Sequence, residues 1–220
     1  MKSQDIGLLL KLLSLQKQEK ASGRINIDSH VRATWPDDWC DWDIELEGEQ
    51  STYVNGLAFN RYAESLYTVR ALAQATGISK SQINTSLNRC IAVGLAKKDR
   101  KTGVPKPNKK ALFDFIVSGL KYVFPVTPGA LTRGIATAFA APVLNKKLMS
   151  TGDFALVWPD AKGSTKGMSV EPLFKAATYA VRYDPEMYAL LALIDSIRLG
   201  QPREANLAIN LLRSHFELEP

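Results

Sequence analysis

The chain of 220 residues is poor in the residues that build metal centres and disulfide frameworks. It has two cysteines, Cys40 and Cys90, and two histidines, His30 and His215. Two cysteines cannot make a disulfide framework or a four-cysteine zinc site. Neither histidine has a cysteine or carboxylate partner at the spacing of metal ligands. The sequence therefore predicts no bound metal.

The chain also lacks a long apolar run. No stretch of about 18 apolar residues could span a membrane, and residues 6–15 are interrupted by Lys11 and Ser14. The first five residues show neither the apolar core nor the cleavage site of a secretory signal. Hydrophobic residues make up 45% of the chain and charged residues 23%, which is typical of a globular protein with a buried core. We expect a cytoplasmic protein that does not enter a membrane.

Motifs of catalysis are missing too. Residues 161–167 are rich in glycine but lack the Gly-Lys-Ser/Thr order of a phosphate-binding loop, so we expect a turn there. No nucleophile elbow supports serine or cysteine catalysis. Arg133, between apolar stretches, either bonds backbone carbonyls or binds a carboxylate or phosphate. We predict a protein that is not an enzyme, with no catalytic residue and no cofactor.

What the chain does have is positive charge in one place. The net charge is +6, and residues 80–110 alone hold nine Lys or Arg against the single acid Asp99. Residues 1–79 carry a net charge of −3 and residues 111–220 a net charge of +1. A polyanion-binding surface needs such clustering, because each phosphate contact releases condensed counterions. The alternative is a basic face that is exposed to solvent and has no partner.

The segment before this charge has the pattern of a short helix and a tight turn. Thr68 can cap a helix over residues 69–76. Gly77 suits the positive φ of a turn, and Ile78 is the apolar residue that fixes the turn. The pattern therefore predicts that a second helix follows directly.

That second helix starts at a capping box and carries one apolar stripe. Ser79 and Gln82 have the spacing at which each side chain reaches the backbone of the other. Ile83, Leu87 and Ile91 recur at i, i+4 and i+8, which predicts a single buried face. After the helix ends at Gly94, we expect a strand over residues 95–99 and a basic loop over residues 100–107, and together they would form a hairpin.

Residues 67–95 and the basic hairpin resemble the winged helix-turn-helix regulators of the MarR type. The small residue Ala73, the turn glycine Gly77 and the apolar Ile83 fall at the spacing that this motif uses. The resemblance covers residues 66–110 well and a first predicted helix, over residues 5–18, loosely. It implies that the second helix of the motif enters the major groove of double-stranded DNA.

The predicted second helix presents polar side chains opposite its apolar stripe. Asparagine can bond adenine through two hydrogen bonds, Lys and Arg suit guanine or phosphate, and Ser and Thr serve either. The hairpin would contact the phosphate backbone of DNA or an adjacent minor groove. The residues expected to bind DNA are Ser79, Lys80, Ser81, Gln82, Asn84, Thr85, Asn88 and Arg89 on the helix, and Lys97, Lys98, Arg100, Lys101 and Lys106 on the hairpin.

A segment before the motif is acidic and rich in tryptophan. Residues 35–49 hold three of the four tryptophans and seven acidic residues, and the alternation from residue 42 to 47 predicts a short half-buried strand. We interpret residues 21–65 as an insertion, which is not typical of small regulators of this type. Its tryptophans either seed a small local core or dock a protein partner. The third alternative is that the segment folds over the basic hairpin and competes with DNA.

The pattern as a whole predicts an α+β fold dominated by helix. We place a winged helix-turn-helix domain at residues 1–120 and a smaller mixed α/β domain at residues 121–220. The broad apolar face of the first helix indicates either the centre of a core or a contact with a second chain. Further helices are expected at 109–119, 185–199 and 203–216, strands at 122–125 and 154–158, and the last two helices would form a hairpin.

The expected function is that of a sequence-specific DNA-binding transcriptional regulator, with repression as its outcome. A homodimer would place two recognition helices in successive major grooves about 34 Å apart. The C-terminal half would bind a ligand, hold a protein partner or form the dimer. The alternative from another class is a protein-interaction module, since a winged helix joined to a partner domain is similar to certain bacterial antitoxins.

Overall fold

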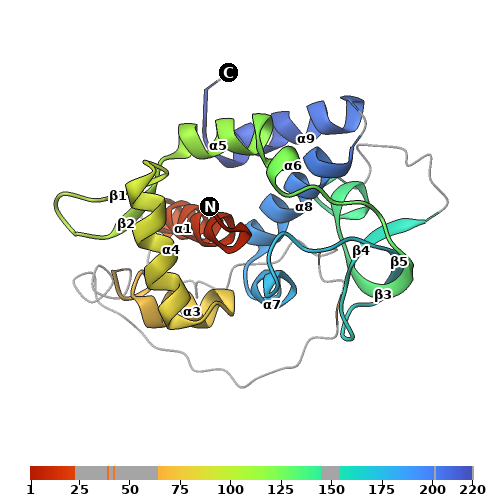
Figure 1. Cartoon of the computed structure of the whole chain (residues 1–220), viewed down its shortest axis with the longest axis horizontal. Helices are drawn as coiled ribbons and strands as arrows, with labels where there is room; N and C mark the ends of the chain where they lie inside the picture. Colours follow the sequence, from red (N-terminus) through yellow and green to blue (C-terminus); the bar gives the residue numbers. More distant parts are fainter. Residues whose placement is uncertain (23–38, 40–41, 43–63, 145–153, 201, 220) are drawn as a thin grey trace.

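The structure is a computed structural model that describes residues 1–22, 39, 42, 64–144, 154–200 and 202–219. Helices and two small sheets make up the described residues (Figure 1), which confirms the predicted α+β class. The elements of the first part, in chain order, are α1 (Ser3–Ser22), α3 (Val69–Thr76), α4 (Lys80–Ala92), β1 (Ala96–Lys98), β2 (Pro105–Pro107), α5 (Lys109–Ser118) and α6 (Leu120–Val123).

The second part combines a three-stranded sheet with three helices. Its elements are β3 (Leu131–Ala136), the short 3-10 helix η1 (Ala138–Ala140), β4 (Ala155–Pro159), β5 (Thr165–Ser169), α7 (Ala177–Val181), α8 (Pro185–Leu199) and α9 (Pro202–His215). Each strand pairs with the other two, since β3 is antiparallel to both and β4 and β5 are parallel. The structure confirms three predicted elements of this part. The strand expected at 154–158 is β4, and the helices expected at 185–199 and 203–216 are α8 and α9.

Helix α1 runs through the centre of the molecule (Figure 1). Every residue from 5 to 15 is buried, and the helix contacts α3, α4 and β2 as well as α8. Its apolar face is thus covered by elements of its own chain, which decides between the two interpretations of that face. The buried apolar side chains of residues 1–120 and 121–220 accordingly belong to one cluster.

Helices α3 and α4 follow the sequence pattern closely at their shared turn. The Oγ1 atom of Thr68 accepts a hydrogen bond from the Ala71 N–H at 3.3 Å, as expected of a cap. Gly77 has a φ of +68° and ends α3. The predicted capping box does not form, because the Ser79 side chain makes no capping hydrogen bond and its Oγ lies 3.3 Å from the Oγ of Ser81.

The buried face of α4 differs from the predicted stripe. Ile83 is fully buried, but Leu87 and Ile91 are only half-buried. Ser86 and Cys90 are buried instead, because small side chains at these positions let α1 approach α4 closely. The Cys90 Sγ lies 4.0 Å from the backbone oxygen of Asp5 on α1. Burial raises the pKa of the Cys90 thiol to about 12, so this thiol stays protonated at neutral pH.

Two further expectations differ from the observed structure. The strand expected at 122–125 is the helical turn α6, because the fully buried Leu120 anchors it and the Phe124 N–H donates to the Leu120 carbonyl at 2.8 Å. Helices α8 and α9 pack together as the expected hairpin. However, 11 residues of α8 are buried, so α8 lies in the core and only α9 has an exposed face.

The described tryptophans of the acidic segment pack against the second half of the chain. Trp39 and Trp42 make edge contacts with the ring of Tyr188 on α8, with ring centroids 6.1 and 5.7 Å apart. Trp42 also forms a β-bridge with Gly163. These rings therefore join the main core and do not seed a local one. The rest of the predicted strand at 42–47 and the acidic residues of the segment lie outside the described residues.

Replacing Gly77 with alanine tests the packing of the turn. A non-glycine residue in the left-handed region costs about 1–2 kcal/mol, and a Cβ at Gly77 would lie 2.9 Å from the Cβ of Ala176. Overpacking adds about 1 kcal/mol or more. Gly103 is the matched control, because it has a φ of +70° and a Cβ there would meet no atom within 4 Å. In urea unfolding, we expect Gly77→Ala to lose more free energy of unfolding than Gly103→Ala, and equal losses would contradict the close contact.

Candidate nucleic-acid interface

The outward face of α4 is polar and free of acidic side chains. Lys80, Ser81, Asn84, Thr85 and Asn88 are all exposed, and they follow one another at helical spacing on one side of α4. No Asp or Glu occurs between Lys80 and Ala92. A helix face of this kind offers hydrogen-bond donors and acceptors without repelling a polyanion. Ser79 and Gln82, at the start of the helix, are exposed as well.

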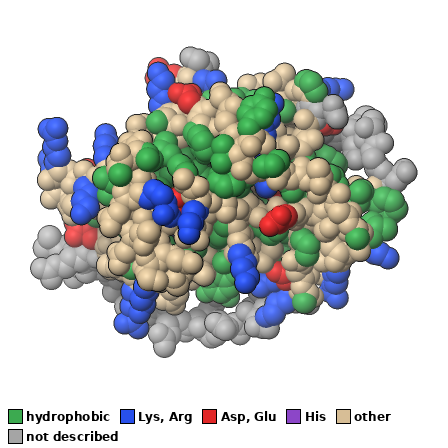
Figure 2. All heavy atoms as spheres, viewed as in Figure 1, with side chains coloured by type: hydrophobic (Ala, Val, Ile, Leu, Met, Phe, Trp, Pro, Cys, Tyr) green, Lys and Arg blue, Asp and Glu red, His purple; other side chains and the backbone are tan. Residues whose placement is uncertain are grey.

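The hairpin β1–β2 follows α4 directly and extends this surface with cations. Lys97, Lys98, Arg100 and Lys101 are exposed, and β1 pairs antiparallel with β2 from Ala96 opposite Pro107. Figure 2 shows Lys and Arg side chains over the part of the molecule where β1, β2 and α4 lie in Figure 1. The basic loop expected over residues 100–107 begins as a turn, in which Arg100 and Lys101 are exposed, but its last three residues form the strand β2.

The one acid of residues 80–110 is used within the hairpin. The Asp99 carboxylate accepts a hydrogen bond from the Lys106 Nζ at 2.8 Å. It also accepts hydrogen bonds from the backbone N–H groups of Thr102 and Lys101, each at 3.0 Å. These bonds hold the pKa of Asp99 well below its usual value. Asp99 therefore shapes the turn and is neutralised by Lys106, which is half-buried.

Arg89 of α4 is bound by Asp5 of α1. Its Nε and Nη2 atoms donate to the two carboxylate oxygens of Asp5, each at 2.7 Å. Burial raises the pKa of Asp5, but the hydrogen bonds from Arg89, from the backbone of Lys2 and from Ser86 outweigh it, so this pKa lies below its usual value. Arg89 thus fixes α4 on α1. Of the thirteen residues expected to bind DNA, eleven are exposed, and Arg89 and Lys106 are half-buried and paired.

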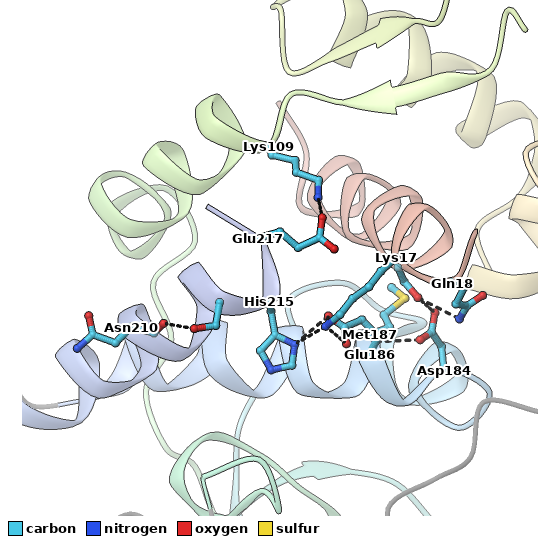
Figure 3. A network of polar contacts seen from close by, with 11 residues as sticks. Lys17, Gln18, Lys109, Asp184, Glu186, Met187, Asn210, His215 and Glu217 are labelled. Carbon is cyan, nitrogen blue, oxygen red and sulfur yellow. Dashed lines mark hydrogen bonds and ion pairs between the residues drawn. The ribbon is translucent and has the colours of Figure 1, made fainter. Parts of the chain in front are cut away.

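Polar contacts also connect α1 to α8 and to the C-terminal residues of the chain. Figure 3 shows Lys17 of α1 reaching Glu186 of α8, which also contacts His215 of α9. The Lys17 Nζ lies 2.8 Å from both carboxylate oxygens of Glu186, and the His215 Nδ1 lies 2.8 Å from Oε1. Glu217 accepts from Lys20 and Lys109 in the same region, which lowers its pKa to about 2. The helix that supports α4 is therefore held at both its faces.

Two acids that position this support form ion pairs that were not expected from the sequence. Asp5 and Asp184 are buried and bind cations from other elements. A signal was present, because Asp5, Lys11 and Ser14 are the polar residues within an otherwise apolar helix face. Their partners could not be found from the sequence, since Arg89 and Asp184 lie 84 and 173 residues away from Asp5 and Lys11.

Arg133 is the other residue that the sequence indicates as a candidate site. The Arg133 Nε donates to the Gly163 carbonyl, which is the backbone-bonding role considered for it. In the part of the chain that the structure describes, no group of three or more His, Cys, Asp or Glu side chains could hold a metal ion. Among the same residues, no helix combines the length and apolarity needed to cross a membrane.

The comparisons with known proteins add no relationship to this geometry. Comparison of the chain with protein-family models, with curated protein sequences and with solved structures finds no match.

Proposed function

We propose that this protein is a sequence-specific DNA-binding transcriptional regulator of the winged helix-turn-helix type, acting as a repressor. The observation that carries the proposal is the continuity of two surfaces: the acid-free polar face of α4 and the cationic hairpin β1–β2. In such proteins, a helix supplies base contacts in the major groove, and basic side chains beside it hold the phosphates.

The order of elements supports the same proposal. Helices α1, α3 and α4 are followed by a two-stranded hairpin, which is the order of elements that a winged helix would have. In the proposed fold, α4 is the recognition helix and β1–β2 is the wing. The burial of α1 and the two hydrogen bonds that Arg89 donates to the Asp5 carboxylate keep α4 in a fixed orientation. Double-stranded DNA is the proposed partner, and a homodimer would contact two half-sites about 34 Å apart.

Asn84→Ala tests whether α4 reads bases. A duplex is first selected from a random pool by the intact protein, and affinities for it and for its scrambled sequence are compared. An asparagine that bonds adenine through two hydrogen bonds contributes about 1–3 kcal/mol of discrimination. We therefore expect the variant to lose about tenfold or more of the discrimination between the duplexes, with its affinity for scrambled DNA unchanged.

Asn206→Ala is the matched control, because Asn206 is an exposed asparagine on a helix, α9, that lies outside the proposed interface. Its discrimination should equal that of the unmodified protein. Discrimination retained in Asn84→Ala would show that this residue does not read the sequence. Equal losses in both variants would point to a general effect of the substitution.

A further inference from the structure

A short helix from the second half of the chain lies against the turn between α3 and α4. Helix α7 contacts α3 and is drawn beside it in Figure 1. A Cβ on Gly77 would lie 2.9 Å from the Ala176 Cβ and 3.1 Å from the Tyr179 Cδ1. The turn leads directly into the N-terminus of α4, and a recognition helix contacts bases with its N-terminal residues. Helix α7 therefore borders the end of α4 that is closest to DNA in the proposed complex.

The position of α7 is fixed by contacts on either side of it. Before the helix, the buried Phe174 packs against Gly7 of α1, where a Cβ would lie 2.6 Å from the Phe174 ring. After the helix, Arg182 forms an ion pair with Asp160. Ala177, Ala180 and Val181 of α7 are buried. Because both flanks and one face of α7 are held, its outward side chains have a defined place next to the turn.

Two tyrosines and a lysine lie on α7 and directly beside it, with Tyr179 on the helix and Tyr183 two residues after its end. Tyr179 and Tyr183 are 39% and 65% exposed, and their ring centroids lie 5.4 Å apart. Lys175, which precedes the helix, is exposed. Tyrosine hydroxyls and lysine ammonium groups are donors that commonly contact DNA phosphates.

We propose that Lys175, Tyr179 and Tyr183 contact the phosphate backbone of DNA beside the N-terminus of α4. The C-terminal half would then extend the DNA-binding surface beyond the winged helix and help to set its register on the duplex. This inference rests on the proposed function, since it needs α4 to bind DNA. It gives the second half of the chain a direct part in binding, in addition to any role in dimerisation.

The test uses the intact protein, a fluorescent mixed-sequence duplex of about 30 base pairs and a series of salt concentrations. If Lys175 contacts a phosphate, Lys175→Gln should reduce the slope of log K against log salt by about 0.9. Tyr179→Phe combined with Tyr183→Phe keeps the rings and removes both hydroxyls. We expect this double variant to bind about tenfold more weakly, with an unchanged salt slope, because no charge is lost.

Helix α6 supplies the matched controls. Lys121 and Tyr122 are exposed there, Tyr122 at 74%. Helix α6 packs on α5 and α8 and is drawn apart from α3 in Figure 1. Lys121→Gln and Tyr122→Phe should leave affinity and slope unchanged. One outcome would overturn the role of α7 and leave the proposed function standing. In that outcome, the intact protein binds DNA and Lys101→Gln weakens binding, but both variants of the α7 region bind as the intact protein does. Equal effects in the α6 controls would overturn the role of α7 too. Failure of the intact protein to bind any duplex would overturn both proposals.

Discussion

Replacing Lys11 with methionine is expected to lower the free energy of unfolding by about 3–5 kcal/mol. The Lys11 Nζ lies 2.8 Å from the Asp184 Oδ2, and the two side chains are only 9% and 1% exposed. The variant leaves a buried carboxylate without its cation, bonded only by the Ser14 hydroxyl and the Met187 N–H. Urea unfolding of the intact chain measures the loss. Because α1 supports both halves, we expect the whole chain to lose stability in one transition.

Two further variants separate the effect of the lost charge on stability from the effect of the lost packing. Lys17→Met removes a cation from the same helix, but its ion pair with Glu186 is partly exposed, so the loss should stay at about 1 kcal/mol or less. Adding Asp184→Asn to Lys11→Met removes the stranded charge while keeping an oxygen that can cap α8. We expect the double variant to recover much of the lost stability. A Lys11→Met variant that is no less stable than Lys17→Met would contradict the role assigned to this buried pair.

Removing cations from the hairpin is expected to give the largest change in DNA binding. Combined replacement of Lys97, Lys98 and Lys101 with glutamine should reduce the slope of log K against log salt by about 2–3. Affinity near physiological salt should fall on the order of 100-fold. All three side chains are exposed, so the stability of the fold should change little. Fluorescence anisotropy at several salt concentrations gives both quantities.

A second triple variant controls for net charge. Lys121, Lys166 and Arg203 are exposed on α6, β5 and α9, and their replacement with glutamine removes the same charge elsewhere on the molecule. This variant should keep nearly all of the affinity. If both triple variants weaken binding equally, DNA is attracted by net charge alone and the hairpin is not its site.

The elements that sequence patterns predicted best are those whose ends carry local signals. Thr68 and Gly77 bound α3, and Asp184 and Pro185 open α8, because capping hydrogen bonds and backbone conformation act over a few residues. The strand expected at 122–125 failed for the opposite reason. Its aromatic and β-branched residues favour a strand locally, but the burial of Leu120 stabilises a helical turn there.

The features that could not be predicted depend on residues far apart in the chain. The buried stripe of α4 runs through Ser86 and Cys90 because α1 packs there, which periodicity within α4 does not reveal. Arg89 looked like a DNA contact, and only the fold shows that Asp5 holds it. The contact of Ala176 and Tyr179 with Gly77 likewise exists only in three dimensions. The exposed face of α4 could be foreseen, because its polar residues recur at helical spacing.

The most direct measurement of the central claim is the affinity of the intact protein for DNA. A duplex selected from a random pool and a scrambled duplex of equal length are compared at two salt concentrations. We expect the selected duplex to bind about 1,000-fold more tightly or better, with both affinities falling as salt rises. Equal affinities would contradict sequence-specific regulation and leave a general polyanion surface. No binding to either duplex at low salt would contradict DNA binding altogether and assign α4 and the hairpin to a protein partner.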